Sequence, residues 1–368
     1  MKRLLCIVGG MNRGGAETFL MKIYRQLDKT KYQMDFCVGF HKPGDYDEEI
    51  KKLGGEILYT TPKSKNPIAS FYNIYKIVKT NNYDYVLRIS QNSLSCLELL
   101  AARLAGAKNT IFRSSNTQSC GNKINGILHR LFKPLAYFVP TTHISPSKEA
   151  AKFMFGTLNK VTILNNGLDT KQFKFSFEKR NEIRKQFNAE NNFIIGHIGR
   201  FNLQKNHKFL LEVFAEIKKQ KENAVLWLIG KGKLETEIEK QAKKLNILDS
   251  IKFLGIRSDI PDLLSAMDVF VFPSLFEGMP NTVIEAQTNG LPCLIANTIT
   301  KQAKQTEIVH FMSLKQTFSE WANKAIEIVE KQNLDTRIKY AEEMKRAGYN
   351  ISIVTEQFVK IVFEENKK

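Results

Sequence analysis

The feature that most constrains the fold of this chain is a regular alternation of short apolar runs with longer segments of helical periodicity. The runs are rich in branched and aromatic residues, which is typical of parallel strands buried on both faces. A first series comprises Leu4 to Val8, Met34 to Val38, Glu56 to Tyr59, Tyr85 to Ile89, Thr110 to Phe112, Thr142 to Ser145 and Val161 to Leu164. A second comprises Phe193 to Ile198, Ala224 to Ile229, Ile251 to Phe253, Val269 to Phe272 and Pro292 to Ala296. The alternation predicts an α/β protein with two doubly wound parallel sheets.

Length and composition agree with that prediction. A chain of 368 residues exceeds what one core usually supports, so we expect two domains, 1–175 and 176–350, with a boundary in the charged stretch Lys171 to Lys185. No run of about 18 uncharged apolar residues is present, so no transmembrane helix is expected. Lys2 and Arg3 could open a signal peptide, but the apolar run that follows is too short, and we interpret it as a buried strand. Cysteines that are odd in number and far apart favour a reducing cytoplasm: Cys6, Cys37, Cys96, Cys120 and Cys293.

Two acids mark the strongest candidate site. Glu277 and Glu285 are separated by seven residues, directly after the predicted strand Val269 to Phe272. We expect a helix from Thr282 to Asn289, with Asn281 as its cap and Gly290 as its stop. Both acids then lie at the carboxyl edge of a sheet, where open α/β folds bind ligands, and the amides of Gly278, Met279 and Pro280 face the same crevice. Carboxylates there suit the neutral hydroxyls of a sugar and a ribose, and amides suit a diphosphate.

Two bases follow another strand of the second series. Arg200 and Lys205 lie in the segment GRFNLQKNH, just after the strand that ends at Ile198. Two cations in that place can hold a diphosphate and neutralise the charge that it gains on leaving. In the first series, the loop MNRGGAE places Gly14 and Gly15 before a helix, which allows close approach of a ligand to the backbone. The two glycines are weaker evidence, because a plain strand-to-helix turn has the same composition.

Together these segments resemble the retaining glycosyltransferases of family four, which have the GT-B fold of two Rossmann-like domains facing across a cleft. The resemblance runs nearly end to end. It is carried, in order, by GGAE, NNGLDTKQF, GHIGRFNLQKNH and FEGMPNTVIEAQTNGLP at residues 14–17, 165–173, 196–207 and 276–292. It implies an N-terminal acceptor domain and a C-terminal nucleotide-sugar donor domain, and a C-terminal helix, about Ile351 to Asn366, that crosses back onto the first domain.

The resemblance also implies an activity. A sugar would pass, with retention and without a metal or cofactor, from a donor expected to be UDP-linked to a hydroxyl of a lipid-linked glycan. The setting would be bacterial capsule, exopolysaccharide or lipopolysaccharide synthesis at the cytoplasmic face of the membrane. Glu277 would orient the donor sugar, Glu285 would take the ribose hydroxyls, and Arg200 with Lys205 would stabilise the diphosphate. The glycines of GGAE would line the cleft, and the backbone near Gly255 to Arg257 would contact the base.

One position departs from the family pattern. Many members carry a His after a central strand of the first domain, where this chain reads Arg113, Ser114, Ser115 and Asn116. An Arg can donate hydrogen bonds to a hydroxyl or a phosphate, but it cannot shuttle protons at neutral pH. A catalytically silent nucleotide-sugar-binding partner is therefore one alternative. An enzyme resembling a UDP-sugar 2-epimerase, which has a similar two-domain fold, is another.

Basic charge is concentrated in the first half of the chain. Residues 1–175 hold 26 Lys and Arg against 12 Asp and Glu, a net charge of +14, which leaves +4 for residues 176–368. No nucleic-acid recognition motif accompanies this charge, so we expect no nucleic-acid partner. From Lys123 to Phe138, apolar residues at helical spacing alternate with Lys123, Arg130 and Lys133. Such a helix either faces the core or meets an anionic membrane, and the resemblance favours peripheral membrane association.

Metal ligands are not evident in the sequence. Asp45, Tyr46 and Asp47 form a DxD pattern, but the acids and the helical run that follow favour acids at a helix start. The six histidines show no paired metal spacing, and His197 lies in an apolar strand and is interpreted as a core residue. We therefore expect a site that works without a metal.

Overall fold

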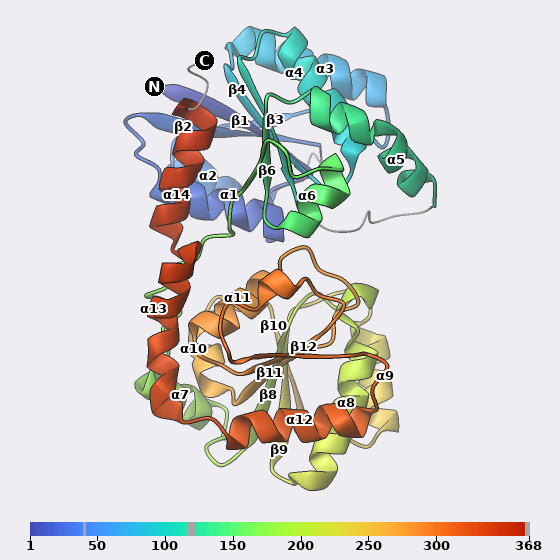
Figure 1. Ribbon diagram of the computed structural model, residues 1–368, viewed down its shortest axis with the longest axis vertical. Helices are drawn as coiled ribbons and strands as arrows, with labels where there is room; N and C mark the ends of the chain where they lie inside the picture. The colour runs from blue at the N-terminus through green and yellow to red at the C-terminus, as the bar shows by residue number, and fades with distance from the viewer. Residues whose placement is uncertain (40–41, 116–122, 365–368) are drawn as a thin grey trace. The chain divides into compact units, whose positions relative to one another are not determined.

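The computed structural model describes residues 1–39, 42–115 and 123–364, and the chain divides into two compact units. Unit 1 comprises residues 1–167 and 348–368, and unit 2 comprises residues 168–347. The sequence-based division placed the boundaries at 175/176 and 350/351. Each unit contains one parallel sheet with helices packed against it (Figure 1), so the prediction of two doubly wound sheets is confirmed.

The sheet of unit 1 has the order β3-β2-β1-β4-β5-β6-β7, and all its pairings are parallel. Its strands are β1 (Lys2–Val8), β2 (Tyr32–Val38), β3 (Ile57–Tyr59), β4 (Tyr85–Ser90), β5 (Asn109–Ser114), β6 (Thr142–Ser145) and β7 (Val161–Ile163). The strand β1 is an inner strand, and the chain runs from it first toward β3 and then, starting again at β4, toward β7. The order therefore reverses between β1 and β4.

Helices cover both faces of this sheet (Figure 1). They are α1 (Gly15–Gln26), α2 (Asp47–Lys52), α3 (Pro67–Asn81), α4 (Cys96–Leu104), α5 (Lys123–Phe138), α6 (Lys148–Phe155) and α14 (Ile351–Val359). One apolar core joins the sheet to α1, α2 and α14, and a second joins its other face to α3, α4, α5 and α6. Successive strand residues, such as Cys6 and Ile7, therefore belong to different cores, because neighbouring side chains of a strand point to opposite faces.

The sheet of unit 2 has the order β10-β9-β8-β11-β12-β13 and is also parallel. Its strands are β8 (Phe193–Ile198), β9 (Ala224–Ile229), β10 (Ile251–Gly255), β11 (Val269–Phe272), β12 (Cys293–Ala296) and β13 (Val309–Met312). Its helices are α7 (Phe177–Gln186), α8 (His207–Gln220), α9 (Glu235–Lys244), α10 (Ile260–Ala266), α11 (Asn281–Thr288), α12 (Phe318–Glu330) and α13 (Tyr340–Met344). The edge strand β13 is an addition to the predicted series.

The end of the chain completes unit 1. After a break at Gly348, where φ is +81°, α14 and a following π-helical turn (Lys360–Glu364) pack against α1 and the first strands. The Phe358 ring lies 6.2 Å from that of Phe19, and Phe363 packs between Tyr32 and Tyr85. The expected C-terminal helix is therefore present as two helical segments that belong to the core of unit 1.

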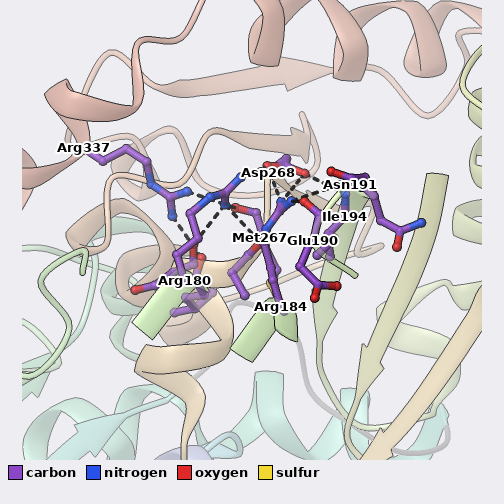
Figure 2. A network of polar contacts seen from close by, with 12 residues as sticks. Arg180, Arg184, Glu190, Asn191, Ile194, Met267, Asp268 and Arg337 are labelled. Carbon is purple, nitrogen blue, oxygen red and sulfur yellow. Dashed lines mark hydrogen bonds and ion pairs between the residues drawn. The ribbon is translucent and has the colours of Figure 1, made fainter. Parts of the chain in front are cut away.

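A buried charge network lies at the amino edge of the sheet of unit 2 (Figure 2). Asp268 directly precedes β11, and its carboxylate accepts from the guanidinium groups of Arg180, at 2.5 Å, and Arg184, at 2.7 Å. It also accepts from the backbone N–H of Ile194, at 2.8 Å. The carboxylate thus ties α7 to the starts of two neighbouring strands.

The arginines of this network also hold the main chain. Arg337 is fully buried, and its guanidinium lies 4.3 Å from the ring centroid of Phe175. Arg180 and Arg337 together donate to carbonyls at the end of α10, at 2.9 to 3.1 Å, and these carbonyls belong to Leu264, Ser265, Ala266 and Met267. The last carbonyls of a helix have no partner within it, so the arginines satisfy acceptors that burial would otherwise leave costly.

The described cysteines and the acids of the DxD segment have structural positions. Cys6, Cys37, Cys96 and Cys293 are buried free thiols, and Cys120 lies outside the described residues. Asp47, Glu48 and Glu49 form the first turn of α2, as expected for the DxD segment, and Asp45 accepts from the N–H of Arg13 at 2.9 Å.

Within the described ranges, no helix combines the length and apolar character needed to cross a membrane. In the same residues, no group of three or more His, Cys, Asp or Glu side chains is placed to hold a metal ion.

Candidate active site

The candidate site of unit 2 lies where the direction of its strand order reverses. The strands β8 and β11 are neighbours in the sheet but not in the sequence, because the chain winds first toward β10 and then back toward β13. The loops that follow β8 and β11 therefore leave the same carboxyl edge side by side. In doubly wound folds this reversal point is where ligands bind.

The two loops are held together by hydrogen bonds. Gln204 accepts from the N–H of Leu275 at 2.8 Å and donates its side-chain amide to the carbonyl of Phe276 at 2.9 Å. Asn206 donates its side-chain amide to the carbonyl of Pro273 at 3.1 Å. Asn206 has a φ of +54°, a left-handed conformation that Asn tolerates, and this turn directs the chain into α8. The predicted base-bearing loop and acid-bearing loop therefore form one structure.

Lys205 and Glu277 meet directly at this junction. The Lys205 ammonium lies 2.7 Å from the Glu277 carboxylate, and the two side chains are only 16% and 11% exposed. The ammonium also lies 4.4 Å from the ring centroid of Phe272, the last residue of β11. A Cβ added at Gly199 would lie 3.0 Å from the aliphatic part of the Lys205 side chain. The absence of a side chain at Gly199 therefore leaves room for the lysine to cross the loop. The sequence predicted both residues as site residues but did not predict that they pair.

Arg200 lies between this glycine and the lysine. It is exposed, and its carbonyl accepts from the N–H of Asn202 at 2.8 Å in the tight turn before Leu203. The side chain of Asn202 then accepts from the N–H of Lys205 at 3.2 Å. Arg200 and Lys205 thus lie at the two ends of one short, internally bonded turn, one exposed and the other nearly buried.

The acid-bearing loop leads into α11 as predicted, but its cap differs. The cap position belongs to Pro280, with φ −76° and ψ 106°, and Asn281 is the first helical residue rather than the cap. Proline fits there because its fixed φ suits the entry to a helix and the first N–H groups are unbonded within it. Gly278, Met279 and Pro280 are buried, and Glu285 is half-buried one turn into the helix. Gly290 follows the helix with φ +70°, as expected for its stop.

The floor of the site is made of backbone packed on backbone. A Cβ at Gly230 would lie 2.1 Å from the carbonyl oxygen of Gly199, and one at Gly232 would lie 2.3 Å from that of Phe201. The Gly230 N–H donates to the carbonyl of Gly255 at 2.8 Å. The sequence analysis missed Gly230 and Gly232, although two glycines directly after a buried strand were a signal for such a close approach.

Two buried histidines lie beneath the loops. His197 donates through Nδ1 to the carbonyl of Val271 at 2.9 Å, and its ring lies 4.7 Å from that of His207. Burial, followed by the charge of neighbouring groups, lowers the pKa of His197 well below its usual range and that of His207 to about 4. His197 is a core residue, as expected. Its Nε2 and both ring nitrogens of His207 have no hydrogen-bond partner among the described residues.

The predicted site residues of unit 1 lie in different surroundings. Gly14 caps α1 with extended backbone, and a Cβ at Gly15 would meet nothing within 4 Å, so tight packing does not require a glycine at position 15. Arg113 ends β5 almost fully buried, donating to the Asn166 side chain at 2.5 Å and lying 3.8 Å from the Phe19 ring centroid. Burial lowers the pKa of Arg113 to about 9. Asn116, in the same predicted segment, lies outside the described residues.

The helix α5 presents apolar side chains outward. Its exposed large apolar side chains, between 43% and 73% accessible, are those of Ile127, Leu131, Leu135 and Phe138. Leu128 and Phe132 are half-buried and Ala136 is buried, so the predicted apolar stripe divides between the core and the surface. Arg130 is exposed, whereas Lys133 is half-buried and lies against Gly156, and burial lowers its pKa.

A parallel sheet with bases after one strand and an acid after its neighbour, at the point where the order reverses, is typical of α/β proteins that bind nucleotides or phosphates. Comparison with known proteins gives the family. The model for glycosyl transferases group 1 matches residues 178–350. The chain is 36% identical over 330 residues to the putative glycosyltransferase EpsF of Bacillus subtilis, covering 87% of this chain and 86% of that protein. The chain belongs to the group 1 glycosyl transferase family.

Other similarities are more distant. The chain is 26% identical over 306 residues to the UDP-Gal:alpha-D-GlcNAc-diphosphoundecaprenol alpha-1,3-galactosyltransferase of Escherichia coli, covering 80% of this chain and 78% of that enzyme. Among solved structures, Anabaena Alr3699/HepE in complex with UDP is similar, with a TM-score of 0.79 and 20% identity, over 98% of this chain and 99% of that one. At that identity the structural likeness supports the fold alone.

Proposed function

We propose that this protein is a retaining glycosyltransferase that moves a sugar from a UDP-sugar to a hydroxyl of a lipid-linked glycan in the synthesis of a bacterial surface polysaccharide. The observation that carries the proposal is the Lys205–Glu277 pair at the strand-order reversal, with Arg200 in the same turn. The name of the Escherichia coli relative supports the two substrates, because it specifies a UDP-linked donor and a diphosphoundecaprenol-linked acceptor.

In this proposal each side chain has a separate task. Arg200 and Lys205 bind the diphosphate and stabilise the charge that develops as it departs. Glu277 accepts hydrogen bonds from the donor sugar, and Glu285 accepts them from the ribose. Because Glu277 holds Lys205 in the structure described above, an arriving diphosphate competes with that carboxylate for the lysine. Binding of the donor would thereby release Glu277 toward the sugar.

The positive charge that the leaving group needs comes, in this proposal, from the protein. Arg200 and Lys205 take the place that a divalent cation has in metal-dependent transferases. We therefore expect activity to persist in excess EDTA. A loss of turnover that manganese or magnesium restores would contradict this part of the proposal.

The test of the function is product analysis with candidate UDP-sugars. The protein should release UDP and transfer the sugar to a lipid-linked acceptor, and the anomeric configuration of the product should match that of the donor. Replacing Arg200 or Lys205 by Ala should lower the rate about 10²-fold while the fold persists. Lys208→Ala, an exposed base at the start of α8, is the matched control. Interconversion of sugars without transfer would indicate an epimerase, and binding without turnover would indicate a silent partner.

We also propose that unit 1 meets the cytoplasmic face of the cell membrane through α5, as a peripheral contact. The supporting observations are the four exposed apolar side chains of this helix, the exposed Arg130 beside them and the net charge of +14 in residues 1–175. An exposed base near an anionic surface contributes about 1 kcal/mol of attraction, and salt screens it. Partial insertion of apolar residues adds to this attraction.

Liposome sedimentation tests the membrane contact. Vesicles containing anionic lipid should sediment the protein at low salt and release most of it at high salt. Arg130→Glu and Leu131→Ser should each weaken sedimentation, whereas Lys52→Glu, at the end of α2, should have a much smaller effect. Lys133 is unsuitable for this test because its stem packs against Gly156. Indifference to anionic vesicles at low salt would remove the membrane from the proposal.

A further inference from the structure

Arg113 of unit 1 is a buried cation that forms no ion pair within the described residues. It is the last residue but one of β5, at the carboxyl edge of the sheet, and only 2% of it is exposed. Burial lowers its pKa to about 9, and no neighbouring charge contributes to that shift. Taking a charge out of water without a counterion is costly, so stability does not explain an arginine at this position. The carboxyl edge of such a sheet is where doubly wound folds bind ligands.

The other buried arginines of the described ranges are compensated. Arg88, Arg180 and Arg184 each form an ion pair with an acid. Arg337 has no acid within ion-pair distance in the same ranges, but its guanidinium donates four hydrogen bonds, one from Nε, one from Nη1 and two from Nη2. Arg113 has neither an acid nor a comparable set of acceptors, and this distinguishes it from the arginines that hold the fold.

Most donors of Arg113 are unused in the described contacts. An arginine has five N–H donors, and Arg113 makes one hydrogen bond, from Nη2 to the side-chain oxygen of Asn166 at 2.5 Å. Its Nε is enclosed and has no partner in the same residues. The guanidinium lies over the ring of Phe19, 3.8 Å from the centroid. The ring offsets part of the charge, but the N–H groups in the plane of the guanidinium still lack acceptors.

The sequence around Arg113 supplies no counterion. No Asp or Glu occurs between Glu98 and Glu149, a stretch that includes residues 116–122 outside the described ranges. Glu98 already pairs with Arg88, and Glu149 is exposed on α6. An anion that balances Arg113 is therefore not provided by this part of the chain.

The one acceptor that Arg113 has can be replaced by a ligand. Asn166 follows β7, is half-buried and offers a neutral amide oxygen. A carboxylate can accept from Nη2 in its place, because a hydrogen bond between two charged groups is stronger than one to an amide. The planar guanidinium presents parallel N–H groups that match the two oxygens of a carboxylate. A single positive charge with no second cation acting on it suits a monoanion better than a diphosphate.

We propose that Arg113 binds the carboxylate of an acidic sugar, such as a uronic acid, in the acceptor substrate. The inference rests on the proposed function, with unit 1 as the domain that takes the acceptor, and it specifies the sugar class of that acceptor. The carboxylate accepts two hydrogen bonds from the guanidinium and neutralises its charge, while Phe19 remains against the guanidinium face. A neutral sugar leaves the charge of Arg113 uncompensated and is bound more weakly.

Thermal stabilisation by small probes tests the site directly. At equal ionic strength, D-glucuronate should raise the melting temperature of the wild type and leave that of Arg113→Met unchanged. Arg103→Met is the matched control and should respond like the wild type, because Arg103 is exposed and donates only to the carbonyl of Val139 among the described contacts. D-glucose, which has no carboxylate, should stabilise none of the three proteins. Equal shifts with glucuronate in all three, or no shift in the wild type, would overturn the inference. Stronger stabilisation by inorganic phosphate than by glucuronate would overturn the choice of a carboxylate.

Stability without a ligand separates this role from a structural one. Arg113→Met replaces an uncompensated cation by an apolar side chain, so its urea midpoint should equal or exceed that of the wild type. A lower midpoint together with an unchanged response to glucuronate would assign Arg113 to the fold. Arg113→Lys keeps the charge but not the paired N–H groups, and its response to glucuronate should be weaker than that of the wild type. This second variant decides the question if Arg113→Met does not fold.

Acceptor kinetics extend the test to the reaction. For the wild type, a lipid-linked acceptor that ends in glucuronate should have a KM about tenfold or more below that of the same acceptor ending in glucose, because only the first makes the charge-assisted contact. Arg113→Met should remove this difference and leave the KM for the UDP-sugar unchanged. If glucuronate binding depends on Arg113 but no sugar is transferred, the carboxylate site stands and the proposed function fails. If transfer proceeds and the wild type has equal KM values for both acceptors, the function stands and the inference fails.

Discussion

The two ends of β11 each have a carboxylate paired with basic side chains, and the two arrangements differ in what else the bases hold. At the amino end, Asp268 accepts hydrogen bonds from arginines that also donate to backbone carbonyls at the end of α10 (Figure 2). At the carboxyl end, Glu277 meets Lys205, whose ammonium has no further hydrogen bond among the described contacts and lies over an aromatic ring.

This difference distinguishes charged groups that stabilise the fold, at Asp268, from a charged group that can bind a ligand, at Glu277. A guanidinium with several fixed acceptors holds the main chain and cannot leave without exposing them. A single ammonium on a flexible stem can exchange one anion for another. We therefore expect the amino end of β11 to determine stability and the carboxyl end to determine turnover.

The largest effect should come from the amino end. Asp268→Asn leaves Arg180 and Arg184 without their shared counterion, and breaking such a buried pair costs about 3 to 5 kcal/mol. The urea midpoint should fall accordingly. Asp259→Asn, which breaks a partly exposed pair with Arg257, should cost about 1 kcal/mol or less. A midpoint for Asp268→Asn that matches that of Asp259→Asn would remove the distinction between the two ends.

A smaller effect on stability, with a large one on rate, should come from the carboxyl end. Glu277→Gln removes the charge that orients the sugar, and kcat should fall about 10²-fold, equivalent to about 2.7 kcal/mol. The same change frees Lys205 for the diphosphate, so UDP should bind as tightly as before or more tightly. Calorimetry with UDP and initial rates measure the two quantities. Weaker UDP binding in this variant would mean that Glu277 supports the diphosphate site rather than competing with it.

The smallest effect should come from the histidines beneath that site, and it depends on pH. His207 has a pKa of about 4 in the folded protein and about 6.5 when unfolded, so acid favours the unfolded chain. Stability that is complete above pH 6.5 should fall as the pH drops toward 4, by about 2 kcal/mol between pH 7 and pH 5 for this group. Urea midpoints at the two pH values should differ less in His207→Gln than in the wild type. An equal difference in both would assign the acid sensitivity to other groups.

Much of the fold could be predicted because a short run of apolar residues is enough to identify a buried parallel strand. The bounds of β8, β9 and β11 match their predicted runs, since both faces of a central strand are apolar and the residues that flank it are polar, glycine or proline. The strand β13 was missed because it lies at the edge, where His310 interrupts a run of only four residues. Its pattern resembles a loop, and only its pairing with β12 makes it a strand.

The candidate site was predictable as a set of residues but not as a set of contacts. The spacing of Glu277 and Glu285 after a strand identified the acids, but the pairing of Glu277 with Lys205 joins residues 72 positions apart and depends on which strands are neighbours. The arginines around Asp268 were missed for a related reason. An arginine in a helix such as α7 has the sequence character of a solvated side chain, and only the unpaired carbonyls of another element make it a core residue.

The return of the chain to unit 1 has a consequence for its biosynthesis. The core beneath α1 needs the side chains of Ile351, Val354 and Phe358, which are synthesised after the whole of unit 2. At 5 to 20 residues per second, the ribosome takes roughly 10 to 40 s to make the intervening segment. During that interval the N-terminal sheet has only α1 and α2 on the face that α14 later completes, while unit 2 can complete its own core. We therefore expect unit 2 to mature first, and the newly made first half of the chain to be the part that a chaperone protects.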